Sequence, residues 1–180
     1  MIGRDSGKGE EGLGVGVQVS VKDSARWRDK WTFEKYASQE DYEAGNPYEV
    51  NEVEQGNLLL NSGINEMWQL ISGASANHFD NTNARLGVGD SETVAEAAQP
   101  DLQAATNKVY LAMQDTYPTT GASQKIVFRG ISDGSTANFD WREFVAKQNV
   151  SGICLNRLVS SQGTKASGQV WTVTLEISLS

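Results

Sequence analysis

The chain has 180 residues, of which 38% are hydrophobic and 21% charged; this composition excludes disordered and collagen-like chains and is typical of a folded domain. Its net charge is -8 and no cluster of Lys and Arg stands out, so we expect neither nucleic acid nor a membrane as a partner. No stretch has the about 18 apolar residues of a transmembrane helix, and the N-terminus lacks an apolar signal core. We therefore expect synthesis in the cytoplasm.

The N-terminal segment changes character at residue 13. Residues 1 to 12 are rich in glycine and charged side chains, and they hold too few apolar groups to offset the entropy of ordering. The next residues alternate strictly between apolar and small or polar side chains, which predicts a half-buried strand. Its apolar positions are Leu13, Val15, Val17, Val19 and Val21.

Aromatic residues gather between positions 27 and 48, among many charges and few aliphatic side chains. Aromatic side chains are the anchors that protein interfaces favour, although they serve equally well in the core of their own domain. The net charge is -5 over the first 55 residues and -3 over the other 125. We predict an extended N-terminal arm over 1–55 and a β-rich body over 56–180. The candidate partner-binding residues are Trp27, Trp31, Phe33, Tyr36, Tyr42 and Tyr48.

The clearest helical pattern covers about residues 57–72. Asn57 is a suitable N-cap and Gly73 a suitable stop. The apolar residues between them recur every three or four positions, which predicts one buried face: Leu60, Ile64, Met67, Trp68 and Ile71. A capping-box pattern from Thr93 to Glu96 indicates a second, short helix over 93–98.

The remaining sequence has the period of two that is typical of strands. The strongest alternation is at the C-terminus, and turn-forming residues at 132–135 separate two earlier strands. Several short strands without regular strand–helix alternation favour a mainly β fold, an antiparallel sandwich or jelly roll. The alternating apolar positions are Val109, Leu111 and Met113; Ile126 and Phe128; Phe139 and Trp141; and Trp171, Val173, Leu175, Ile177 and Leu179.

A short motif at residues 89–91 resembles a catalytic block. Gly89-Asp90-Ser91 is similar to the nucleophile motif of GDS-type lipases, in which the serine needs a histidine base. That family carries its histidine near the C-terminus, whereas His78 is the last histidine here. The hydrolase interpretation therefore lacks its base, and a local turn is the better prediction.

Metal and thiol chemistry are limited by composition. One histidine, His78, and one cysteine, Cys154, exclude paired-thiolate zinc sites and an internal disulfide. A nucleophilic Cys154–His78 pair competes with a simple buried cysteine and a loop histidine. Asp80 and Asp90, with the nearby Asn81 and Asn83, offer oxygen ligands for a structural calcium, but without the EF-hand order. We predict no enzymatic activity and no cofactor.

Six segments, taken together, resemble a widespread group of tailed-bacteriophage virion proteins. Their order and spacing cover about residues 57–180, while residues 1–56 match much less distinctively. The segments are Asn57-Leu-Leu-Leu-Asn-Ser-Gly-Ile, Leu86-Gly-Val-Gly-Asp-Ser, Ala137-Asn-Phe-Asp-Trp-Arg-Glu-Phe, Leu155-Asn-Arg, Gly163-Thr-Lys and Trp171-Thr-Val-Thr-Leu-Glu-Ile.

The resemblance implies a virion structural protein, with a capsid decoration (cement) protein as the leading interpretation. Such a protein binds the outer head surface, so the implied partners are the major capsid protein and further copies of the chain, as a homotrimer. The implied location is the capsid surface, after synthesis in the host cytoplasm. The alternatives are a tail or baseplate adaptor or fibre component, a receptor- or glycan-binding jelly roll, and the hydrolase discussed above.

Overall fold

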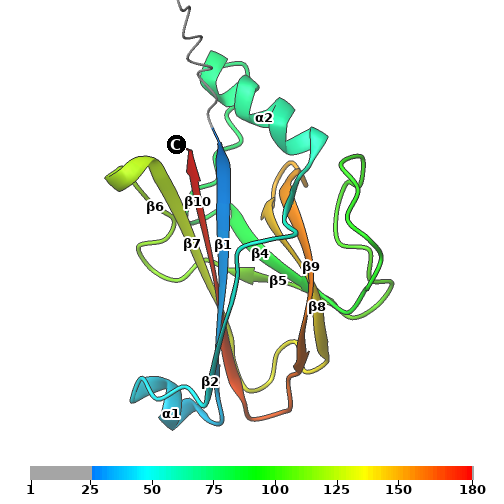
Figure 1. Ribbon diagram of the computed structural model, residues 1–180. Helices are drawn as coiled ribbons and strands as arrows, with labels where there is room; N and C mark the ends of the chain where they lie inside the picture. The colour runs from blue at the N-terminus through cyan, green and yellow to red at the C-terminus, as the bar shows by residue number, and fades with distance from the viewer. Residues whose placement is uncertain (1–25, 180) are drawn as a thin grey trace, which may run out of the picture.

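The computed structural model describes residues 26–179. The strand expected at residues 13–21, and the rest of the expected arm before residue 26, lie outside this range. Two antiparallel sheets of five strands each face one another (Figure 1). The prediction of a mainly β sandwich with one clear helix is thereby confirmed.

The first sheet has the strand order β2-β1-β10-β7-β6. Strands β1 and β10 pair along ten residues each, so the first described strand and the end of the chain lie side by side within this sheet (Figure 1). The bounds are β1 (Trp27–Tyr36), β2 (Glu49–Val53), β6 (Thr119–Thr120), β7 (Lys125–Ser132) and β10 (Val170–Leu179), with helix α1 (Gln39–Glu43) between β1 and β2 and a 3-10 turn, η1 (Ala122–Gln124), before β7.

The second sheet has the strand order β3-β9-β8-β4-β5. Helix α2 (Asn61–Ser72) follows the edge strand β3 and packs near the start of β9 at one end of the sandwich (Figure 1). The bounds are β3 (Leu58–Leu59), β4 (Ala84–Gly89), β5 (Lys108–Ala112), β8 (Asp140–Gln148) and β9 (Cys154–Thr164).

The core between the sheets is built from the alternating apolar positions that the sequence shows. Trp171, Val173, Leu175 and Ile177 of β10 are buried there, as their period of two predicts. Aromatic rings from both sheets meet in the middle: the ring centroids of Phe33 and Phe144 lie 4.5 Å apart. The centroids of Trp141 and Trp171 lie 5.0 Å apart, edge to face, which is a favourable geometry.

The predicted boundary at residue 55 is wrong for the described chain. Strand β1 pairs with β10 on one side and β2 on the other, so residues 27–53 belong to the sandwich. Trp31 and Phe33 are fully buried in its core. Few aliphatic residues surround them in the sequence because the apolar groups they pack against come from β10 and from the opposite sheet.

A second apolar cluster lies on the outer face of the second sheet. Leu60, Leu102, Val145 and Cys154 form this cluster, with Tyr110 packed against it. Leu102 belongs to the long connection between β4 and β5, residues 90–107, which covers this face. The second sheet is therefore buried on both sides, unlike the first.

A buried ion pair holds this covering loop in place. Arg157 on β9 and Glu143 on β8 are both fully buried, with Nη2 and Oε2 2.7 Å apart. The Glu143 carboxylate also accepts hydrogen bonds from the backbone amides of Gln103 and Ala104, at 2.8 and 2.7 Å. The Arg157 guanidinium donates to the carbonyl oxygen of Thr93 at 2.9 Å.

These contacts explain why the helix predicted over 93–98 is not formed. The Thr93 carbonyl is bound by Arg157, and the Glu96 amide is bound by the side chain of Gln99. Both backbone groups are thus engaged by side chains, and the segment is irregular. Tertiary hydrogen bonds outweigh a weak local capping signal.

Helix α2 confirms the predicted helix but begins later. Residues Leu58–Leu59 pair with β9 instead, and Asn57, the predicted cap, accepts a hydrogen bond from Asn156. The helix ends as predicted at Gly73, which has the left-handed φ of 73° that glycine tolerates. Gly63 faces β9, where a Cβ atom would lie 2.3 Å from the Leu155 carbonyl oxygen, so only glycine permits this approach.

We expect the Trp31→Ala variant to lose about 3 to 5 kcal/mol of unfolding free energy, because it empties a fully buried site in the shared core. Tyr48→Ala is the matched control: Tyr48 is 52% exposed, and its loss should change stability by about 0.5 kcal/mol or less. Urea denaturation monitored by circular dichroism measures both.

Deletion of residues 1–48 should leave a chain that does not fold, and a cooperative transition from it would contradict this architecture.

We expect Arg157→Met to cost about 3 to 5 kcal/mol, because it leaves the Glu143 carboxylate buried without its cation. Arg142→Met is the control, since the Arg142–Glu92 pair is partly exposed and should be worth about 1 kcal/mol or less. Hydrogen exchange should also become faster at the amides of Gln103 and Ala104 in the first variant alone. Equal stability losses in the two variants would contradict the role given to the buried pair.

Candidate partner-binding surface

The six aromatic residues predicted to bind a partner do not form one surface. Trp31, Phe33 and Tyr36 are 0%, 0% and 4% exposed, so they serve the fold and offer nothing to a partner. The hydroxyl of the half-buried Tyr42 accepts a hydrogen bond from Gln114, and its ring packs edge-on against Tyr36. Tyr48 alone is largely exposed.

Exposed apolar side chains are found on helix α2. Trp68 is 63% exposed and Ile71 is 76% exposed, although the sequence pattern placed both on a buried face. We call these two residues the α2 surface. The helix packs instead through the side that carries Gly63 and Glu66, the two buried residues of α2.

The reason for this error lies in the width of the apolar stripe. Ile64, Met67 and Leu70 share the helix with Trp68 and Ile71, so the apolar residues cover more of the circumference than one neighbouring sheet can bury. The helix approaches β9 most closely at Gly63. The apolar side chains that lie farther around the helix from Gly63, those of Trp68 and Ile71, therefore remain exposed. The sequence pattern does not identify which part of the stripe is exposed, because the contact between Gly63 and Leu155 of β9 is a tertiary one.

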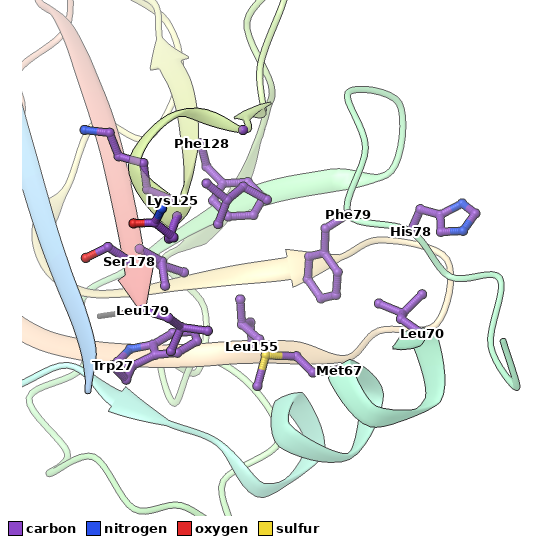
Figure 2. Close-up of a pocket in the computed structure, with 14 residues that line it drawn as sticks. Trp27, Met67, Leu70, His78, Phe79, Lys125, Phe128, Leu155, Ser178 and Leu179 are labelled. Atoms are coloured by element: carbon purple, nitrogen blue, oxygen red, sulfur yellow. The ribbon is translucent and has the colours of Figure 1, made fainter. Parts of the chain in front are cut away.

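An apolar cavity of about 500 Å³ opens at the same end of the sandwich (Figure 2). Figure 2 shows Trp27, Met67, Phe79, Leu155 and Leu179 around one space, from β1, α2, the loop after α2, β9 and β10. These side chains give the cavity apolar walls, and the polar groups that also line it are few. The other lining residues are Leu70, His78, Gly121, Gln124, Lys125, Ile126, Phe128, Ile177 and Ser178.

The structure does not bring Cys154 and His78 together. Cys154 lies fully buried in the second apolar cluster, where its thiol donates to Asp101 Oδ1 at 3.3 Å. His78 lines the cavity with Leu155, the residue that follows Cys154 and points to the opposite face of β9. Burial raises the pKa of the Cys154 thiol, and the neighbouring Asp101 raises it further.

The Gly89-Asp90-Ser91 motif makes local contacts. Asp90 accepts a hydrogen bond from the Asn107 side chain at 2.7 Å, and Ser91 Oγ accepts one from the Thr93 amide at 3.1 Å. Gly89 is needed for packing, because a Cβ atom there would lie 2.5 Å from a carboxylate oxygen of Glu143. The motif thus lies at the end of β4, where the chain becomes irregular beside the buried ion pair.

The two aspartates considered for calcium lie at opposite ends of β4. Asp80 precedes the strand and accepts hydrogen bonds from Asn83, while Asp90 follows the strand and binds Asn107. Within residues 26–179, no three acidic, histidine or cysteine side chains gather in a way that could hold a metal ion. Neither α1 nor α2 reaches the length and apolarity that crossing a membrane requires.

Lys165 forms a buried contact that the sequence did not predict in detail. Its ammonium group donates to the carbonyl oxygens of Asp133 and Thr136, at 2.6 and 3.0 Å, and to Asn138 Oδ1 at 2.7 Å. Burial lowers the pKa of this lysine. The three acceptors belong to the loop between β7 and β8, so Lys165 fixes that loop from within the same chain.

Comparison of the chain with protein-family models, with curated protein sequences and with solved structures finds no match. The resemblance to phage virion proteins therefore depends on the six segments alone. In the structure these segments include Gly89, Glu143 and Arg157, which form the buried ion pair and its surroundings, and Lys165, which holds a loop. These four residues of the segments thus serve the fold.

We expect Cys154 to be inert toward a thiol reagent such as dithionitrobenzoate in the native protein. The thiol is fully buried and its raised pKa keeps it protonated at neutral pH, whereas the reaction needs an exposed thiolate. One equivalent of thiol should be titrated only after denaturant is added. Rapid reaction of the folded protein would contradict the position given to Cys154.

Proposed function

We propose that this chain is a structural protein of a tailed-bacteriophage virion, a capsid decoration protein that binds the outer surface of the head. Two kinds of evidence support the proposal. The six sequence segments resemble phage virion proteins, and the β-sandwich that they help to build is a compact unit suited to repeated display on a particle.

The structural observation that carries the proposed contact with the head is the α2 surface. Trp68 and Ile71 extend from one helix into solvent, and tryptophan is among the residues most enriched in the energetically dominant parts of interfaces. The two side chains are three positions apart on α2 and therefore lie side by side, so together they offer a partner an apolar contact. The acidic net charge of -8 suits a protein displayed toward solvent.

The mechanism we propose is stabilisation by binding. The protein would contact neighbouring copies of the major capsid protein through the α2 surface, as a homotrimer. Because the complete site exists only in the assembled head, binding lowers the free energy of the assembled state relative to dissociated subunits. An interface of standard size, about 1,600 Å² in total, is sufficient for such a contact.

We expect Ile71→Lys to weaken binding to purified heads at least tenfold, which corresponds to about 1.4 kcal/mol, because it places a charge in the centre of the apolar contact. Val94→Lys is the matched control: Val94 is also 76% exposed, lies in the loop after β4, and receives the same change. Co-sedimentation with heads measures both. Equal binding by the two variants would contradict the proposed contact.

The number of copies per particle separates head from tail. Quantitative staining of purified virions against the major capsid protein should give hundreds of copies of a head decoration protein. A handful or a few dozen copies would contradict the decoration proposal and favour a tail or baseplate adaptor or a fibre component.

A further inference from the structure

We propose that residues 13–21 of the same chain fill the apolar cavity of about 500 Å³ at the α2 end. The apolar side of this segment carries Leu13 and four valines at alternate positions. The proposal is independent of the virion function, since it concerns contacts within one chain.

The cavity needs an apolar occupant. Its walls include Trp27, Met67, Phe79 and Leu155, and Leu179 at its edge is 49% exposed. Each Å² of apolar surface that is removed from water contributes about 25 cal/mol. Covering these walls with apolar side chains is therefore favourable, and a segment with one apolar side needs such a surface for the same reason.

Connectivity selects this segment as the occupant. Trp27 lines the cavity and begins β1, so the chain before it starts at the cavity wall. The connection from Val21 to Trp27 is at most roughly 20 Å long, which brings the valines nearest to β1 within reach of the opening. The other side of the segment carries Gly14, Gly16, Gln18 and Ser20, which are small or polar and suit a position that faces solvent.

The short connection also favours the cavity of the same chain over that of a second copy. A short flexible linker gives its two ends an effective concentration of about millimolar. At micromolar protein concentration, the segment therefore meets its own cavity far more often than a neighbour's. A peptide segment of another protein would have to compete with this high effective concentration of the chain's own segment.

The test uses a methyl group inside the cavity as a reporter. Met67 lines the cavity, Met113 is buried elsewhere in the core, and no valine is among the described residues that line the cavity. In full-length protein labelled at methionine and valine methyl groups, we expect nuclear Overhauser contacts between Met67 and valine. Their absence in the unmodified protein would overturn the proposal.

Two variants then identify the segment. Val19→Asp with Val21→Asp, at the two valines nearest to β1, should abolish the Met67–valine contact and shift the Met67 methyl signal, because aspartate does not enter an apolar cavity. Gln18→Asp with Ser20→Asp adds the same charge on the other side and should leave both unchanged. An unchanged Met113 signal shows that each variant is folded. A Met67–valine contact that persists when all four valines of the segment, Val15, Val17, Val19 and Val21, are replaced by aspartate would reject residues 13–21 as the occupant.

Mixed labelling separates the same chain from a second copy. Protein labelled only at methionine is mixed with protein labelled only at valine, and the two are unfolded and refolded together. We expect no Met67–valine contact in this mixture. A contact there would show that the segment of one copy occupies the cavity of another, and it would overturn the assignment to a single chain.

Discussion

The pair formed by Glu143 and Arg157 constrains the whole second sheet. Both side chains are fully buried, and two charges without water are tolerated only where further hydrogen bonds satisfy their remaining oxygens and N–H groups. Here those bonds come from backbone groups of the loop over residues 93–104. The conformation of that loop, and the lack of a side chain at Gly89 beside Glu143, follow from the need to satisfy the pair.

Much of the fold could be predicted because the buried apolar residues of a strand or helix recur at a fixed spacing in the sequence. The alternation along β10 identified its buried side, and the helical spacing before Gly73 identified α2. The same alternation is present in β1, where Trp31 and Phe33 alternate with Thr32 and Glu34. The many charged residues around them nevertheless led to the prediction of an N-terminal arm. Which strands flank β1 is decided by contacts with β10, about 140 residues further along the chain, and no local pattern contains that information.

The candidate site was harder to predict because it depends on what the fold leaves uncovered. Periodicity shows that Trp68 and Ile71 lie on the apolar side of α2, but the exposed part of that side is fixed by the approach of Gly63 to Leu155. Likewise, Trp31 and Tyr48 are both aromatic, but Trp31 packs against Phe144 of the opposite sheet, whereas Tyr48 lies just before β2 and is largely exposed. Residue type indicates what can bind, whereas tertiary packing decides what remains available.

The distribution of charge distinguishes two regions of the surface. The outer face of the first sheet carries ion pairs whose charges are partly exposed and already paired. Lys30–Glu52 and Lys125–Glu176 join neighbouring strands, and Arg129–Glu34 joins β7 to β1 across β10. Such a face remains well solvated and offers a partner little apolar area. The α2 end carries the opposite combination, exposed apolar side chains beside an apolar cavity. A protein that attaches to a particle by one region and meets solvent with another needs this asymmetry, and it is the reason for proposing the α2 surface as the contact.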